Sequence, residues 1–244
     1  MSNVFAITRR ELVGYFTAPL AYIFIVVFLI LSAALTFYVG AFLERGQADL
    51  DSFFRFHPWL YLFLMPALGM RLWAEERKTG TIEFLLTLPV TTGQAVLGKF
   101  LAAWLFAGVA LALTFPIWLT ANYLGAPDNG AILAAYLGSW LMAGGFLALS
   151  AIASALTANQ VIAFVLATAL CFLFLVSGLD IVQAGLEGWA PQAIVDAVAG
   201  FSFLTNFQAI ASGVIDLRNV LFFVVLIVVG LTINTALVEL EQGA

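Results

Sequence analysis

The sequence predicts an all-α integral membrane protein, and three observations indicate this class. Hydrophobic residues make up 64% of the 244 positions, and the mean hydropathy is +1.08. Charged residues make up only 9%, against about 25% in an ordinary soluble domain. Several uncharged stretches exceed the roughly 20 residues of helix that cross a hydrocarbon core. We therefore expect one membrane-embedded helical bundle with little mass outside the lipid.

The N-terminal stretch predicts an interfacial elbow helix over residues 3–17. Most of one helical face there is apolar: Val4, Phe5, Thr8, Leu12, Tyr15 and Phe16. Such a weak amphipathic pattern is typical of helices that lie in a membrane interface. Pro19 should separate this helix from a first span at 20–43. The alternative is a plain extension of that span, and the uncharged run is too long for a cleavable signal.

The remaining apolar stretches predict five further spans, at residues 56–73, 96–123, 132–156, 161–178 and 220–238. Pro66 should kink the second span. Residues 129–177 carry no charge and are too long for one crossing at about 1.5 Å per residue, so the polar cluster at 157–160 is the predicted turn. Residues 180–216 contain several glycines and one proline, and we expect short extracytoplasmic helices that dip into the interface. The alternative is a seventh span within 197–215.

The distribution of Lys and Arg predicts the orientation of the chain. With six spans, one side collects Arg9, Arg10, Arg71, Arg77, Lys78 and Lys99, and the other collects Arg45, Arg55 and Arg218. Because basic residues gather on the cytoplasmic side, both termini should be cytoplasmic, in a bacterial inner membrane. We expect Lys99 to snorkel toward the lipid headgroups.

The loop between the second and third predicted spans carries clear capping signals. Gly80 suits a helix C-cap, where φ is positive. Thr81 suits the N-cap of a second short helix, with Glu83 in its first turn. Thr91 and Gln94 have capping-box spacing for the helix that follows. These signals predict a rigid cytoplasmic helix at 80–88 with a charged start and an apolar body; the alternative is a simple connecting loop.

Three segments of the sequence resemble one transporter family. Glu75-Glu76-Arg77-Lys78 and the following residues to Pro89 resemble the hallmark loop of ABC-2 exporter permeases. The run from Arg10-Glu11-Leu12 to Tyr15-Phe16 is similar to their elbow helix. The segment from Gly213 to Val220 is similar to the start of the last span in the gliding-motility-type branch, and nitrous-oxide-reductase maturation permeases have a related pattern. The resemblance covers essentially the whole chain.

The resemblance implies that the chain is a permease subunit that works with other proteins. Its expected partners are a cytoplasmic ABC ATPase subunit, a second or paralogous permease, an extracytoplasmic accessory protein and membrane lipid. ATP and Mg would bind in the ATPase, and this chain would bind no cofactor. The implied ATPase-coupling residues are Glu75, Glu76, Arg77, Lys78, Gly80, Thr81, Ile82, Glu83, Phe84 and Leu85, and the implied elbow residues are Arg9, Arg10 and Glu11.

Several other signals are rejected. The run from Gly93 to Lys99 matches most of a phosphate-binding loop, but Phe100 replaces the Ser/Thr that would hold Mg²⁺. His57 is the single histidine and cannot form a zinc site, so we expect it to be a polar residue at the membrane interface. Ionisable residues near the middle of a span usually mark ion pathways, and none is predicted here.

Other functional classes fit the sequence less well than an ATP-driven permease. The net charge of −5 and the absence of a basic run argue against nucleic-acid binding. An intramembrane enzyme would need a polar catalytic cluster, which the sequence lacks. The open alternative is a non-transporting membrane anchor or regulatory subunit of an ABC-type motility or maturation complex. Small residues in the fourth span predict close helix contacts at a dimer seam: Ser139, Ala143, Ser150 and Ser154.

Overall fold

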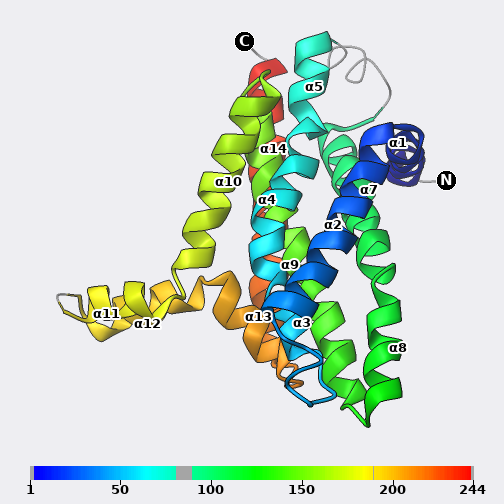
Figure 1. The fold of residues 1–244 in the computed structure, drawn as a ribbon. Coiled ribbons are helices and arrows are strands. Elements are labelled where there is room, and N and C mark those ends of the chain that lie inside the picture. Colours follow the sequence, from blue (N-terminus) through cyan, green and yellow to red (C-terminus); the bar gives the residue numbers. More distant parts are fainter. Residues whose placement is uncertain (1–2, 81–89, 189, 243–244) are drawn as a thin grey trace.

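The computed structural model describes residues 3–80, 90–188 and 190–242, and these residues form helices and connecting segments without a β-strand. Figure 1 shows a lengthwise bundle with one helix, α1 (Asn3–Thr17), across one end. Two further helices, α11 (Asp180–Glu187) and α12 (Gln192–Gly200), project sideways from the other end. The described part of the chain thus confirms the predicted all-α class, and the bounds of α1 match the predicted elbow helix.

The lengthwise helices match the predicted spans closely, and short helices connect them. The long set is α2 (Pro19–Ala34), α4 (His57–Gly69), α5 (Arg71–Thr79), α7 (Thr92–Ala112), α8 (Phe115–Leu124), α9 (Asn129–Ala155), α10 (Gln160–Val176) and α14 (Leu217–Gln242). A π-helical turn (Leu35–Val39) extends α2, and the short helices are α3 (Asp51–Phe54) and α13 (Phe203–Ala211).

Both chain termini lie at the same end of the bundle. We call this the terminal end; it holds α1, α5 and the C-terminal part of α14 (Figure 1). The opposite end holds α3, α8 and α13. From the terminal end, α2, α7–α8 and α10 run away, and α4–α5, α9 and α14 run back. This path agrees with an even number of crossings.

By length and composition, four helical segments could cross a membrane in the described residues. They are Ala21–Val39, Thr92–Leu124, Asn129–Ala155 and Leu217–Leu240. The pairs α10–α11 and α12–α13 also qualify, but they bend by 68° and 65°. Helix α4 has 13 residues and is too short alone, although α5 continues its path. The chain is therefore a multi-pass membrane protein, and the count of six spans stays a prediction.

Proline explains one departure from the predicted spans. The stretch predicted as a continuous span at 96–123 breaks between α7 and α8, at Leu113 and Thr114. Pro116 lies in the first turn of α8 and has no N–H for the carbonyl of Ala112, four residues earlier. Pro66, in contrast, lies inside α4, which continues to Gly69.

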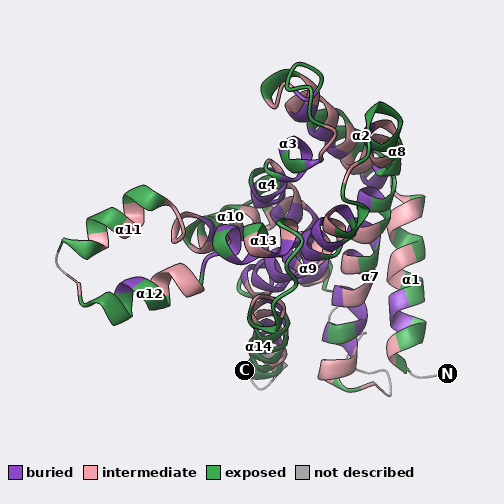
Figure 2. Cartoon of the chain, turned by 90° about the horizontal axis from the view of Figure 1, so that it is seen from below, coloured by how far each residue is buried: buried purple, intermediate pink, exposed green. Residues whose placement is uncertain are grey.

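Residues 180–216 form short helices, as predicted. Helix α11 has no buried residue and α12 buries only Val195, so the pair stands away from the bundle (Figure 2). Helix α13 instead packs on α9, because Phe203, Phe207 and Ile210 point inward and are buried. The alternative seventh span at 197–215 contains the bend between α12 and α13 rather than a straight helix.

Helix α9 is the centre of the bundle, and its small residues determine how closely its neighbours pack. It contacts α4, α5, α7, α10, α13 and α14, and Figure 2 shows it largely buried. A Cβ added at Gly69 of α4 would overlap the Ser150 side chain, and one at Gly230 of α14 would lie 2.9 Å from the Ala148 Cβ. Close contacts of the fourth span are confirmed. A dimer seam at Ser139, Ala143, Ser150 and Ser154 is wrong, because these residues are already buried within this single chain.

His57 lies inside the bundle, at the start of α4, and its expected depth at the membrane interface stays a prediction. Its side chain is fully buried, and Nδ1 lies 2.8 Å from the Ser139 Oγ. The Tyr61 hydroxyl lies 2.8 Å from the same oxygen, and the Phe53 ring packs edge-on against the imidazole. A serine on α9 thus gives one ring nitrogen of His57 a hydrogen-bond partner, whereas Nε2 is buried without one.

The close approach of α4 to α9 predicts different effects for two glycine substitutions. Gly69→Ala should destabilise the protein by about 1–3 kcal/mol, because the new methyl overlaps Ser150. Gly185→Ala in α11 should be neutral or slightly stabilising, because its added Cβ meets nothing within 4 Å. Thermal unfolding in detergent would measure both. Equal melting temperatures for the two variants would contradict this packing.

Candidate functional site

Three helices meet at the terminal end and surround the ends of the predicted coupling segment. Helices α5 and α7 lie directly before and after residues 81–89, and α1 packs along α7 (Figure 2). We call this arrangement of α1, α5 and the first two turns of α7 the elbow junction. It contains every predicted elbow residue and the described part of the predicted coupling set.

A glycine lets α1 approach α7 closely. A Cβ at Gly98 would lie 2.7 Å from the Ile7 Cγ2, so only glycine fits this contact without movement. The Thr8 hydroxyl donates to the Gly98 carbonyl at 3.2 Å. Further along α1, the Tyr15 ring stacks on Phe106 with centroids 5.2 Å apart. Burial, with the Glu11 carboxylate as a second cause, raises the pKa of the Tyr15 phenol.

The helix ends that flank residues 81–89 have the caps that the sequence predicts. Gly80 ends α5 in the left-handed region, with φ of 70°. Thr91 and Gln94 form both hydrogen bonds of a capping box at the start of α7. Both ends of the segment are therefore held in defined backbone geometry. The remaining predicted coupling residues lie outside the described part of the chain: Thr81, Ile82, Glu83, Phe84 and Leu85.

Lys99 links the three helices of the elbow junction. Its Nζ lies 2.7 Å from Glu76 Oε1 on α5 and 3.6 Å from Glu11 Oε1 on α1. It also lies 5.4 Å from the centroid of the Trp73 ring. The Lys99 side chain is only 5% exposed. The expectation that Lys99 snorkels to the headgroups is wrong, because two carboxylates inside the protein neutralise its ammonium.

Two further ion pairs border this link. Arg71 makes two hydrogen bonds to Glu75 within α5, at 2.8 and 3.0 Å. Arg10 bonds Glu11 at 2.6 Å, so Glu11 lies between Arg10 and Lys99. Among the other predicted residues, Arg9 and Lys78 are exposed, and Arg77 is half-buried.

The start of α5 is also fixed to the centre of the bundle. The Ser154 hydroxyl of α9 accepts from the backbone N–H groups of Trp73 and Ala74, at 3.0 and 3.1 Å. The same hydroxyl donates to the Met70 carbonyl at 2.8 Å. Movement of α5 must therefore either carry α9 with it or break these bonds.

Ion pairs between carboxylates and cations dominate the chemistry of the elbow junction. Its polar groups are paired carboxylates and cations, and an ion pair in apolar surroundings is costly to separate. No group of three His, Cys, Asp or Glu residues that could hold a metal is found where the chain is described.

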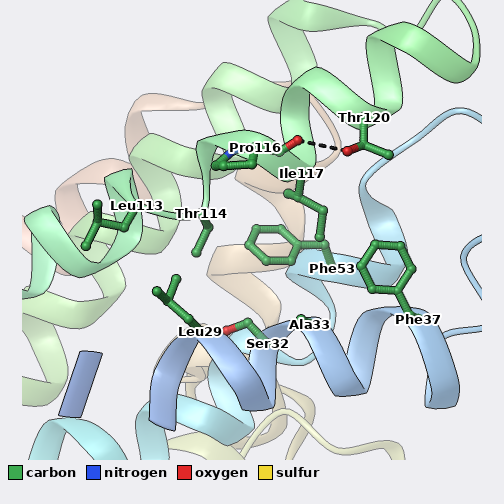
Figure 3. A pocket seen from close by; sticks show the side chains of 10 residues that line it. All are labelled: Leu29, Ser32, Ala33, Phe37, Phe53, Leu113, Thr114, Pro116, Ile117 and Thr120. Atoms are coloured by element: carbon green, nitrogen blue, oxygen red, sulfur yellow. Dashed lines mark hydrogen bonds between the residues drawn. The ribbon is translucent and has the colours of Figure 1, made fainter. Parts of the chain in front are cut away.

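A second candidate, a cavity of about 280 Å³, lies between α2 and the break that separates α7 from α8 (Figure 3). Its lining is mainly apolar and includes Leu29, Phe53 and Ile117. The Thr120 hydroxyl donates to the Pro116 carbonyl at 2.9 Å, so it is already used within α8. An apolar group could therefore fill the cavity, but few polar groups are present to recognise a particular ligand.

Sequence reasoning missed the role of Lys99, although a signal was present. Lys99 is a lone cation inside an otherwise apolar helix, two turns after the capping box. Acidic residues at Glu11 and Glu76 were the available partners. Only the packing of α1 and α5 on α7 shows that all three meet.

Comparison with known protein families gave one match. A family model described as "ABC-2 family transporter protein" matches residues 17–178, about two thirds of the chain. The matched region runs from the end of α1 through α10 and includes α5, residues 81–89 and α7. The search of curated proteins gave no match.

The buried ion pair predicts energetic coupling between Lys99 and Glu76. Lys99→Met should cost about 3 kcal/mol, because it removes the cation from a poorly hydrated Glu76 carboxylate. Glu76→Gln should cost less, because Glu11 still lies beside the ammonium. The double variant should cost less than the sum of the two. Thermal unfolding of all four proteins would measure this cycle.

A matched control is the exposed pair Arg45–Asp51, with a separation of 3.7 Å and side chains 35% and 69% exposed. The same cycle there should give a coupling below about 1 kcal/mol. Strictly additive effects of Lys99→Met and Glu76→Gln would show that the pair does not join α5 to α7.

Proposed function

The chain belongs to the ABC-2 transporter family, and from this premise we propose that it is the permease subunit of an ATP-driven exporter. A separate cytoplasmic ATPase subunit supplies the energy, and the elbow junction receives it. The observation that carries this proposal is Lys99, which joins the elbow helix to both helices that flank residues 81–89.

The charge distribution supports a cytoplasmic terminal end. Six of the nine Lys and Arg residues belong to α1, α5 and the start of α7, at this end. The other three lie in the connection from α2 to α4 and at the start of α14, at the opposite end. Because cytoplasmic loops carry the excess of basic residues, this asymmetry favours cytoplasmic termini.

The proposed ATP site lies in the partner, and the geometry of α7 supports this. The run from Gly93 to Lys99 is continuous helix, whereas a phosphate-binding loop must curve so that its N–H groups surround the phosphates. The Lys99 ammonium is also engaged by two carboxylates. ATP and Mg are therefore assigned to the ATPase subunit, and this chain is assigned the path of the substrate.

Force from the ATPase would pass through the elbow junction into the bundle. In our proposal, residues 80–88 form the coupling helix that contacts the ATPase. The caps at Gly80 and Thr91 hold its two ends, and Lys99 connects α5 and α7 to α1. Ser154 connects α5 to α9. ATP binding would bias the spans between inward-open and outward-open arrangements.

A dimer completes the proposed transporter, formed with a second copy or a paralogous permease. Helices α2 and α10 expose many large apolar side chains, including Ile23, Ile30, Val161 and Leu173. Lipid or a second permease can cover these faces. An extracytoplasmic accessory protein is a further proposed partner.

The proposed function is tested by isolating the complex. The chain should co-purify with an ABC ATPase encoded beside it, and reconstitution should give ATP-dependent movement of a substrate. Binding of the ATPase without transport of any candidate substrate would favour the anchor or regulatory subunit instead. Failure to bind any ATPase would contradict both.

The cap at Gly80 predicts a selective loss of coupling. Gly80→Pro should abolish stimulation of the ATPase and transport, because proline cannot adopt the φ of 70° found there. Glu83→Arg, within the proposed coupling helix, should do the same. Gly46→Pro is the matched control, since Gly46 also has positive φ but lies in the loop at the opposite end. Transport that survives both Gly80→Pro and Glu83→Arg would refute the coupling assignment.

A further inference from the structure

Two neighbouring cavities share part of their lining near the bend between α1 and α2. The first, about 200 Å³, lies between α2 and α4 and is apolar, with Phe24, Leu64 and Ala67 in its lining. The second, about 220 Å³, lies between α1, α5 and α7 and is polar. Both are lined by Tyr15, Ala18 and Arg71. We call the combined space the elbow cavity.

The apolar part of the elbow cavity opens on the side of the bundle. Ile23 and Val27 line it and are 58% and 37% exposed. Its volume is below the roughly 300 Å³ at which small-molecule pockets begin. It can therefore hold part of one hydrocarbon chain that enters from the surrounding lipid, but not a large compact ligand.

The polar part of the elbow cavity presents both signs of charge. Arg71 and Glu75 are paired, with side chains 31% and 44% exposed. Glu75 uses two of the five N–H groups of the Arg71 guanidinium. The other N–H groups can bond a phosphate. The carboxylate oxygens of Glu75 and Glu11 have further lone pairs that can accept from an ammonium.

We propose that the elbow cavity binds a zwitterionic amphiphile that carries a phosphate and an ammonium. Its hydrocarbon chain lies between α2 and α4, its phosphate contacts Arg71, and its ammonium contacts Glu75 and Glu11. The apolar and polar parts lie in the order in which such a molecule sits in a membrane leaflet. A purely anionic headgroup fits less well, because Glu11 and Glu75 balance the Arg71 and Lys99 cations in the same lining and leave no net positive charge.

This inference deepens the proposed function, on which it rests for the cytoplasmic side of the site and for a role in transport. An amphiphile seated here touches α1, α2, α4 and α5. Movement of the elbow junction would therefore change the contacts of the bound amphiphile. We assign such amphiphiles to the class of substrate that the permease moves.

Photocrosslinking of the purified chain tests the site without the ATPase. The probe is lysophosphatidylethanolamine with a diazirine in its acyl chain, added to the protein in nanodiscs of phosphatidylglycerol. Mass spectrometry should place the label on residues 21–27 and 64–68. Unlabelled lysophosphatidylethanolamine should compete better than lysophosphatidylglycerol. Labelling spread evenly over the lipid-facing helices, or equal competition by the two lipids, would overturn the proposal.

Substitutions sharpen this experiment. Ala67→Trp should fill the apolar part and reduce labelling to the lipid-facing background. Ala236→Trp is the matched control, because it fills a groove between α7 and α14 instead. Arg71→Gln should weaken competition by lysophosphatidylethanolamine about tenfold, the equivalent of one lost charge-assisted hydrogen bond.

If Ala67→Trp fails to fold, competition measured with Arg71→Gln still tests the proposed headgroup contact. Unchanged competition with Arg71→Gln, at an unchanged melting temperature, would overturn the headgroup assignment. Because binding is measured on the chain alone, a negative result leaves ATPase coupling untouched. Loss of ATPase coupling would likewise leave a positive crosslink standing.

Discussion

The buried ammonium of Lys99 is the constraint on which the terminal end depends. In apolar surroundings its charge requires a nearby carboxylate, and the structure provides Glu76 from α5 and Glu11 from α1. Separating either helix from α7 would leave charge poorly solvated. The ion pairs therefore hold together α1, α5 and α7, although α2, α3 and α4 separate α1 from α5 along the chain.

Helix α9 extends this constraint into the bundle. Two of its serines bond other helices: Ser139 contacts His57 and Tyr61, and Ser154 bonds the backbone of α5. Small residues on both sides let α4 and α14 approach it closely: Gly69 of α4 faces Ser150, and Gly230 of α14 faces Ala148. Because apolar side chains gain little from leaving lipid, such close packing and hydrogen bonds are the main specific forces between these helices. A shift of α5 would therefore also act on α9, at the centre of the bundle.

The structural features that depend only on neighbouring residues were the most predictable part of this protein. The elbow helix, the cap at Gly80 and the capping box at Thr91 follow from neighbouring residues, and the structure has all three. The buried places of Lys99 and His57 could not be predicted, because their partners lie on other helices. Pro116 in the sequence could have predicted the break at Thr114. Hydropathy alone does not show such a break, because the stretch is apolar on both sides of it.

The most direct test asks which side of the membrane the elbow junction faces. A thiol introduced by Lys78→Cys would be labelled with a membrane-impermeant maleimide, in a Cys171→Ala background, with Gln47→Cys marking the opposite end. Both positions are exposed in the structure. Our account predicts that Gln47→Cys reacts in intact cells and that Lys78→Cys reacts only after permeabilisation. Labelling of Lys78→Cys in intact cells would place the junction beyond the reach of a cytoplasmic ATPase and contradict the account.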